Sequence, residues 1–341
     1  MTVHFLVPDG IDDPRHPSGG NVYDRRLGAA LADLGVPVHE HRVGAAGPGP
    51  LLARLPEGAV VLVDGLIAST TDVLVAESCR LRVAVLLHMP GSGPAEPVVL
   101  RAVHAVVTTS AWARRWVLER QVPADRVQVA VPGADRGPVV TGSADGTRLL
   151  CVGPVTPAKG YDDLLTALAE VRDLAWRCRC VGALDLTPSY VGRLRERARG
   201  LDLADRVELV GPLPPARLDA VRAVTDLVVA PSRRESYGMA LAEGLARGLP
   251  AIATDVGGHP EALGPAAGGS LPGTLVPVGD PTAFARALRE WLGDAVLRDR
   301  WRRAAATRRQ GLGGWGRTAT EVAHVLNRIA PGPVVPVVGR R

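Results

Sequence analysis

The sequence predicts an α/β protein with two doubly wound, Rossmann-like domains. Short apolar runs alternate along the chain with segments in which leucines recur three or four residues apart. This is the pattern of buried strands followed by amphipathic helices. Glycines follow several of the predicted strands, where α/β folds place turns and ligand sites. The length of 341 residues suits two domains that each bury a core of their own.

The first half contains six predicted strands, at residues 3–7, 38–43, 60–63, 83–87, 105–109 and 127–131. A helix is expected over residues 22–34, ending at Gly35, and another over residues 111–120 with Ser110 as its N-cap. Residues 136–147 include three glycines and lack apolar periodicity, which is typical of a linker. We therefore assign residues 1–140 to a first domain.

The second half repeats the alternation, so its sheet should also be parallel. Strands are expected at residues 149–152, 177–181, 207–210 and 226–230, and another within residues 249–258, which end in a glycine pair. Helices are expected at residues 161–171, 190–199, 215–224, 283–292, 295–309 and 315–329. Residues 146–312 form the predicted second domain and residues 315–330 a separate final helix. The proline-rich tail, residues 331–341, is expected to be disordered.

Composition narrows the possible partners and the cellular location. The net charge of +5 is spread along the chain without a basic tract, so nucleic acid is not an expected partner. A peripheral contact with an anionic membrane surface remains compatible with this charge. No apolar run approaches the roughly 18 residues of a spanning helix, and the amino terminus does not resemble a signal peptide. We expect a cytoplasmic protein whose four cysteines are core thiols; the oligomeric state stays open.

The segment from Pro231 to Leu263 carries the strongest functional pattern. An apolar strand ends at its start, and helical spacing begins at Ser236, which we expect to cap the helix. The first amides of a helix favour a phosphate or another anion. The predicted anion-binding amides are those of Tyr237, Gly238 and Met239.

Two carboxylates flank this predicted anion site. Glu235 precedes the helix and Glu243 lies about two turns into it. Like charges repel, so neither suits a phosphate, but each can accept hydrogen bonds from sugar hydroxyls. The structural alternative is that Glu235 caps amides and Glu243 lies on a solvated helix face.

Lys159 is the only lysine among the 40 lysine and arginine residues. It lies between a predicted strand and a predicted helix, directly before Gly160. A lysine in such a loop places a compact positive charge at the carboxyl end of the sheet. We expect its ammonium group to bind a diphosphate.

Two further candidates follow strands of the first half. Gly19 and Gly20 follow the first strand and permit a close approach of backbone to ligand, although an ordinary loop explains a glycine pair equally well. His88 follows the fourth strand, at the edge where open α/β sheets bind ligands. The structural alternative is a histidine whose partner is backbone.

Residues 235–261 resemble the retaining family 4 glycosyltransferases of the GT-B fold. That family has two glutamates separated by seven residues, matched by Glu235 and Glu243, and then a Gly-Gly-x-Pro-Glu segment, matched by residues 257–261. The resemblance implies two Rossmann-like domains facing a central cleft, with the helix over 315–329 returning to the first domain. It also implies retaining transfer of a sugar from a nucleoside-diphosphate sugar to an acceptor.

The resemblance gives each candidate a role. It implies that Glu243 binds the ribose and Glu235 a hydroxyl of the donor sugar, while Lys159 and the Gly238 and Met239 amides bind the diphosphate. His88 would contact the donor sugar beside the reacting carbon. Gly19 and Gly20 would face the phosphates and the acceptor. There is no Asp-x-Asp motif in the sequence, so we expect no divalent cation, and no cofactor besides the sugar-nucleotide co-substrate.

One departure from the family pattern keeps other functions open. Pro154 stands where the family usually has an arginine, which leaves the leaving-group phosphate one cation short unless Arg233 or Arg234 supplies the charge. An inactive nucleotide-sugar-binding homologue and a sugar-nucleotide epimerase on the same fold are the alternatives. A nicotinamide dehydrogenase is disfavoured because no Gly-x-Gly-x-x-Gly follows the first strand.

Overall fold

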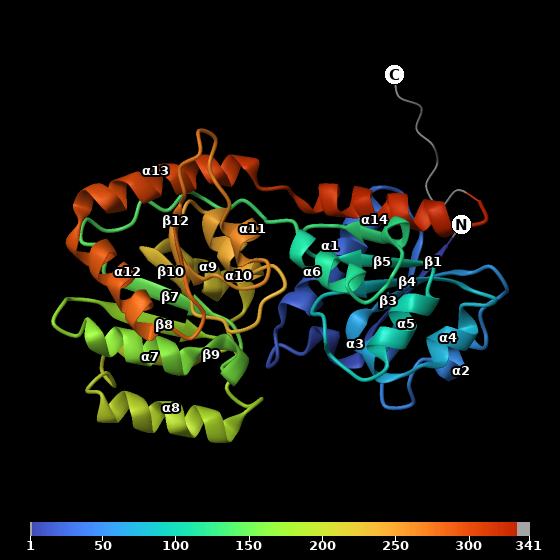
Figure 1. Cartoon of the computed structure of the whole chain (residues 1–341), viewed down its shortest axis with the longest axis horizontal. Helices are drawn as coiled ribbons and strands as arrows, with labels where there is room; N and C mark the ends of the chain where they lie inside the picture. The colour runs from blue at the N-terminus through green and yellow to red at the C-terminus, as the bar shows by residue number, and fades with distance from the viewer. Residues whose placement is uncertain (1, 333–341) are drawn as a thin grey trace. The chain divides into compact units, whose positions relative to one another are not determined.

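The computed structural model describes residues 2–332 and contains two parallel six-stranded sheets (Figure 1). The strands of the first sheet are β1 (Val3–Pro8), β2 (Val38–Val43), β3 (Val60–Asp64), β4 (Arg82–Leu87), β5 (Ala105–Thr108) and β6 (Val127–Val129). Those of the second are β7 (Arg148–Val152), β8 (Arg177–Val181), β9 (Val207–Gly211), β10 (Leu227–Ala230), β11 (Ala251–Thr254) and β12 (Gly273–Val276). The predicted α/β class and the parallel sheets are therefore confirmed.

The helices divide between two compact units. Unit 1 contains α1 (Gly19–Asp33), α2 (Gly49–Leu52), α3 (Gly65–Thr70), α4 (Val73–Glu77), α5 (Glu96–Ala102), α6 (Ala111–Leu118) and α14 (Trp315–Ile329). Unit 2 contains α7 (Tyr161–Glu170), α8 (Pro188–Gly200), α9 (Pro215–Ala223), α10 (Met239–Leu245), α11 (His259–Leu263), α12 (Pro281–Gly293) and α13 (Ala295–Gly311). Unit 2 spans residues 134–312 together with the short segment 13–18.

In unit 1 the strand order is β2-β1-β3-β4-β5-β6. Its central strands are buried on both faces, as expected for a sheet covered by helices. Leu6, Val61 and Val85 belong to one apolar cluster, while their neighbours along the strands point to the opposite face. The chain reverses direction across the sheet between β1 and β3, which is where doubly wound folds place their ligands.

In unit 2 the strand order is β12-β11-β10-β7-β8-β9. Alternate residues of β10 point to opposite faces of the sheet. Leu227 and Val229 pack into the cluster that includes α7, α8 and α12, whereas Val228 packs with α10 and α13. This alternation follows from the period of two in a strand. Here the reversal of direction falls between β7 and β10.

The final helix, α14, belongs to unit 1 and packs against α1 and against β4, β5 and β6 (Figure 1). Trp315 meets the ring of Tyr23 edge-on at 5.4 Å, and Thr318 Oγ1 donates to the carbonyl of Val131 at 2.7 Å. The bounds of this helix are those predicted from its apolar spacing. Of the predicted disordered tail, residues 333–341 lie outside the described residues.

The predicted linker, residues 136–147, is held against unit 2 by hydrogen bonds. The carboxylate of Asp226 accepts from the amide of Ser143 at 2.5 Å and from the amide of Arg148 at 2.9 Å. Burial opposes the charged carboxylate, but these donors outweigh it and lower the pKa of Asp226. The Val140 amide also donates to the carbonyl of Arg247. The segment is thus anchored rather than flexible.

Several local predictions were wrong or incomplete. Helix α1 begins at Gly19, three residues before the predicted start, so Gly19 and Gly20 open the helix instead of forming a separate turn. The short helices α2, α3, α4, α5 and α11 and the strand β12 were not predicted, because segments of four to seven residues carry too little periodicity. Cys79 is exposed, whereas the other three cysteines are buried as expected.

Within residues 2–332, none of the helices combines the length and the apolar character needed to cross a membrane.

We predict that Gly133→Ala destabilises the protein by about 1–3 kcal/mol. A Cβ at residue 133 would lie 2.6 Å from the Cα of Trp315, so the start of α14 would have to move away. Gly28→Ala is the matched control, because nothing lies within 4 Å of a Cβ there and alanine suits a helix interior. Urea unfolding would measure both; equal stability of the two variants would contradict the described docking of α14.

Candidate functional site

The candidate site of unit 2 lies at the carboxyl ends of β7 and β10, where the strand order reverses. The loop after β7 carries Lys159, and the loop after β10 carries Glu235. Because β7 and β10 are neighbours in the sheet, these two loops leave the same edge side by side. The pairing of β7 with β10 therefore brings together two charged side chains that are 76 residues apart in the sequence.

The two loops touch through their backbones. The amide of Arg233 donates to the carbonyl of Ala158 at 2.8 Å. Gly160 has a φ of +67° and packs so closely on Pro231 that a Cβ would collide with the carbonyl oxygen of that residue. Glycine is therefore required at position 160 both for its left-handed backbone and for the close approach.

Lys159 and Glu235 form an ion pair with 2.6 Å between Nζ and Oε2. Their side chains are 24% and 13% exposed, so the pair is largely buried but remains accessible to a ligand. Burial alone would raise the pKa of Glu235, but interactions led by the charge of Lys159 outweigh it and the pKa lies below the ordinary value. Glu235 is therefore a carboxylate at neutral pH.

The predicted Gly-Gly-x-Pro-Glu segment packs directly on the Glu235 loop. The amide of Gly258 donates to the carbonyl of Glu235 at 3.2 Å. A Cβ at Gly257 would collide with the same carbonyl, and one at Gly258 with the carbonyl of Ser236. The two glycines are needed because the backbones of the two segments are in direct contact here. The Gly-Gly-x-Pro-Glu segment therefore supports the loop that carries Glu235.

His259 is a component of this site that sequence reasoning missed. Its side chain is buried, with Nδ1 2.9 Å from the carbonyl of Thr254 and Nε2 3.9 Å from Glu235 Oε2. Burial lowers its pKa, so the neutral ring donates its Nδ1 proton to the carbonyl. Its position between the two glycines and the Pro-Glu pair of the motif was the available signal.

The predicted helix start at Ser236 was wrong. Helix α10 begins at Met239, its N-cap is Gly238, and no side chain caps it. Gly238 has a φ of +101°, which turns the chain into the helix in a conformation that disfavours other residues. Ser236 and Tyr237 are buried in the preceding turn, where burial raises the pKa of Tyr237 to about 12.

Glu243 belongs to a charged network rather than to a solvated helix face. Its carboxylate is paired with the guanidinium of Arg222, which is only 7% exposed. Arg222 also binds Asp219 at 3.1 Å, and Arg247 binds Asp219 at 2.6 Å. The Glu243 side chain itself remains 27% exposed. The network fixes the carboxylate while leaving part of it accessible.

Arg233, a candidate for the cation that is missing at Pro154, is paired with two carboxylates. Its guanidinium lies 2.8 Å from carboxylate oxygens of both Asp162 and Asp163, which raise its pKa. Its charge is therefore already balanced by two carboxylates within unit 2, and its role at the leaving-group phosphate stays a prediction. Arg234 also has an interaction partner.

The candidate site of unit 1 surrounds His88, directly after β4. Nε2 of His88 lies 2.7 Å from Asp24 Oδ1 and 3.5 Å from Asp64 Oδ2. Asp24 comes from α1 and Asp64 is the last residue of β3. A Cβ at Gly20 would approach the ring of His88 to 3.2 Å, so the predicted glycine and histidine do meet. Both aspartates were missed because their neighbours in sequence carry no motif.

The electrostatics of this cluster follow from burial of opposite charges. Burial lowers the pKa of His88, but the two carboxylates outweigh it and the pKa is raised. Burial raises the pKa of Asp64 to about 7. One oxygen each of Asp24 and Asp64 is buried without a hydrogen-bond partner. Asp64 can thus hold a proton close to neutral pH, and one atom of each of the three side chains, all within 4.8 Å of one another, could together hold a cation.

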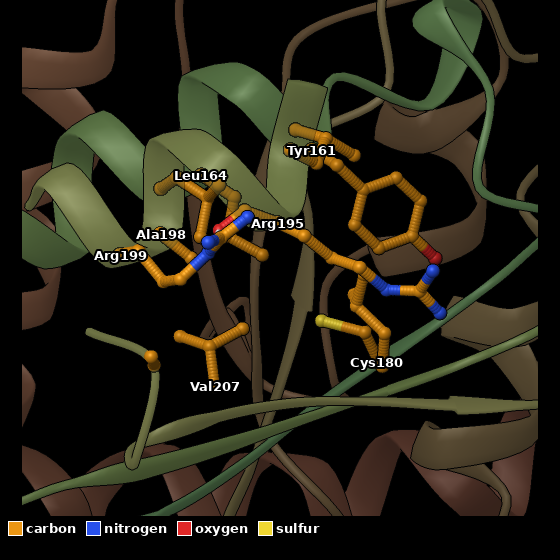
Figure 2. A pocket seen from close by; sticks show the side chains of 11 residues that line it. Tyr161, Leu164, Cys180, Arg195, Ala198, Arg199 and Val207 are labelled. Carbon is orange, nitrogen blue, oxygen red and sulfur yellow. The ribbon is translucent and has the colours of Figure 1, made fainter. Parts of the chain in front are cut away.

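A separate cavity of about 390 Å³ in unit 2 is lined by none of the predicted site residues. Leu164, Ala198 and Val207 give it apolar walls, and Cys180 and the long side chain of Arg195 also line it (Figure 2). It lies among α7, α8 and the strands β8 and β9 rather than at the reversal between β7 and β10. This cavity therefore lies away from the candidate site that contains Lys159 and Glu235.

Comparison with known proteins supports the resemblance to glycosyltransferases independently of the site geometry. Residues 140–308 match the family model described as glycosyl transferases group 1. The chain is 33% identical over 284 residues to the D-inositol 3-phosphate glycosyltransferase of Kineococcus radiotolerans, a match that covers 80% of this chain and 60% of that protein. For the Nocardia farcinica enzyme of the same description, identity is 35% and the shares are 60% and 48%. The chain thus spans roughly half to three fifths of the length of these relatives.

Solved structures show the same fold over nearly the whole chain. Sucrose-phosphate synthase from Thermosynechococcus elongatus has a TM-score of 0.81 at 21% identity, covering 96% of this chain and 99% of that one. HepE from Anabaena, solved with UDP-glucose, has a TM-score of 0.75 at 18% identity, covering 96% and 100%. These are GT-B proteins, and the two doubly wound sheets described above are those of that fold. The chain therefore belongs to the family 4 glycosyltransferases and has the GT-B fold.

Proposed function

We propose that the protein transfers a sugar from a nucleoside-diphosphate sugar to an acceptor, with retention of anomeric configuration and without a divalent cation. The observation that carries the proposal is the Lys159–Glu235 pair at the strand reversal of unit 2. It places a cation for a diphosphate beside a carboxylate for sugar hydroxyls, which is the chemistry that a sugar nucleotide requires. The relatives named above include a protein solved with UDP-glucose.

Lys159 would stabilise the diphosphate. An ammonium group has three donors, and Glu235 takes one of them, so two remain for phosphate oxygens. The carboxylate also holds the long side chain in one orientation, which lowers the entropy lost on binding. The Gly238 and Met239 amides, at the start of α10, would supply further donors, because the first amides of a helix lack intrahelical partners.

The two glutamates would orient the two sugars of the donor. Glu235 keeps one carboxylate oxygen outside its contact with Lys159 and would accept from a hydroxyl of the transferred sugar. Glu243, fixed by Arg222, would accept from the ribose hydroxyls. Catalysis would then rest on positioning and on stabilising the charge that develops on the leaving diphosphate.

In unit 1, we assign His88 to contact with the donor sugar beside the reacting carbon, with Gly19 and Gly20 close to the phosphates. Asp24 positions the imidazole and stabilises its charged form. A same-face displacement, in which the leaving phosphate helps to deprotonate the acceptor, would account for retention. No Asp-x-Asp motif occurs in the sequence, which supports independence from a metal ion.

The direct test is to incubate the untagged full chain with labelled UDP, GDP, ADP and TDP sugars, with and without a panel of hydroxyl-bearing acceptors, and to measure nucleoside diphosphate release, with His88→Ala as the comparison variant. Release that continues in EDTA and yields a product of unchanged anomeric configuration would support the proposal. Binding without release for any acceptor would instead indicate an inactive homologue, which Pro154 makes a real alternative. Interconversion of the donor without an acceptor would indicate an epimerase.

We predict that Lys159→Met weakens binding of the nucleoside diphosphate roughly ten- to hundredfold, because a charge-assisted hydrogen bond contributes about 1.5–3 kcal/mol. Methionine keeps the length of the side chain but removes its charge. Arg303→Met is the matched control, since Arg303 is an exposed cation on α13 of the same unit. Calorimetric titration would measure both, and an equal loss in the two variants would refute the role of Lys159.

We predict that Glu243→Ala abolishes discrimination between a ribonucleoside diphosphate and its 2′-deoxy analogue. The wild type should prefer the ribonucleotide roughly tenfold or more, because a hydroxyl bound to a carboxylate is lost in the analogue. The ratio of the two dissociation constants separates this role from a merely structural one, since loss of the Arg222 pair would weaken both ligands alike. An unchanged ratio would remove Glu243 from the ribose site.

We predict that Asp24→Asn lowers the pKa of His88. The Asp24 carboxylate stabilises the protonated ring, whereas burial favours the neutral ring, so removal of the negative charge leaves burial dominant. NMR titration of the imidazole resonances would measure the shift. Asp33→Asn, an exposed change on the same helix, should leave the pKa of His88 where it is; a fall of equal size there would argue against direct stabilisation by Asp24.

A further inference from the structure

Three of the eight histidines of the chain gather on one face of the first sheet, away from His88. They are His4 on β1 and His39 and His41 on β2. One nitrogen of each ring lies within 4.8 Å of the others. Nδ1 of His4 lies 2.9 Å from Nε2 of His41, and the rings of His39 and His41 stack with 4.4 Å between their centroids.

Strand geometry explains why these rings converge. His39 and His41 are two residues apart on β2, so they point to the same face. The parallel register pairs His4 with His39, which brings its ring to that face as well. The residue between the two β2 histidines, Glu40, lies on the opposite face and pairs with Arg25 of α1. Strand β2 is an edge strand, so the cluster is accessible from solvent and His39 is exposed.

The spacing of the three rings suits them to be ligands of one ion. A neutral imidazole has one nitrogen lone pair with which it can bind a metal. Two nitrogens that bind one tetrahedral zinc ion lie roughly 3.3 Å apart, since each is about 2.0–2.1 Å from the metal. The 2.9 Å contact between His4 and His41 would need to open by only a few tenths of an ångström.

We propose that His4, His39 and His41 form a binding site for a single zinc ion. Three imidazoles are a ligand set that zinc prefers, and three protein ligands leave one coordination position for water or another ligand. Beside His41 lies a cavity of about 350 Å³ bounded by residues 46–55, which has room for that fourth ligand. Arg54 lines the same cavity, so its charge would favour an anionic fourth ligand.

The site is distinct from the proposed transfer site. His4 is the second residue of β1, near the amino end of the strand, whereas Gly20 and His88 follow the carboxyl ends of β1 and β4. A metal bound here would join the edge strand β2 to its neighbour β1 and thereby stabilise the sheet of unit 1. Because the ion binds the folded form, its effect would appear as stability that depends on zinc concentration.

The experiment uses the untagged full chain, stripped with chelator and dialysed against Zn²⁺. We expect one zinc ion per chain by metal analysis, and a thermal midpoint that rises with zinc concentration. Cobalt(II) should substitute and give the intense visible absorption of a tetrahedral site. His39→Ala and His41→Gln should each lower zinc affinity at least tenfold and remove the thermal shift. His39 is exposed, so its replacement tests binding without disturbing the core.

His324→Ala is the matched control, because His324 is an exposed histidine on α14 of the same unit. It should bind zinc like the wild type. Zinc binding that is absent in the wild type, or that persists unchanged in both His39→Ala and His41→Gln, would overturn the proposal. A loss of equal size in His324→Ala would also overturn it, since the ion would then bind surface imidazoles without a defined site.

Discussion

The ion pair between Lys159 and Glu235 is the interaction on which the candidate donor site depends. It joins the loops that follow β7 and β10, the two strands between which the second sheet reverses direction. Both side chains are largely buried, and neither charge would be tolerated there alone, because an unpaired buried charge is costly. Each group therefore requires the other in the unliganded protein, and each keeps hydrogen-bonding capacity for a ligand.

The backbone around this pair is built from glycines that no other residue could replace. Gly160 lies against Pro231, and Gly257 and Gly258 lie against Glu235 and Ser236. The loops around the candidate donor site are thus packed backbone to backbone. Such packing fixes the positions of charged groups within a few tenths of an ångström, which is the precision that binding and catalysis require.

Unit 1 applies the same electrostatic principle to a histidine. His88 is buried between two carboxylates, and the burial that disfavours each charge is offset by the others. The result is a raised pKa for both His88 and Asp64, and that of Asp64 reaches about 7. Clusters of this kind are common at functional sites because small changes in surroundings alter their protonation.

The sequence predicted those elements whose pattern is long and regular. The bounds of β2, β8 and α14 agree with the apolar spacing. Positions after predicted strands led to Lys159 and His88, and the paired glutamates led to Glu235. The start of α10 was wrong because Ser236 resembles an N-cap while the left-handed backbone of Gly238 decides where the helix begins. The contact of Asp24 with His88 depends on how α1 packs on the sheet, and that of His4 with His41 on strand register; these pairs are 64 and 37 residues apart, which no local pattern encodes.

The docking of α14 has a consequence for how the protein is made. Trp315 packs on Tyr23, whose ring in turn contacts His88 at 5.0 Å between centroids. Unit 1 therefore completes its histidine site with a helix that leaves the ribosome only after all of unit 2. Contacts across nearly 300 residues carry a large loop-closure entropy and form slowly. During translation, the uninterrupted part of unit 2 can become native while unit 1 still waits for its last helix.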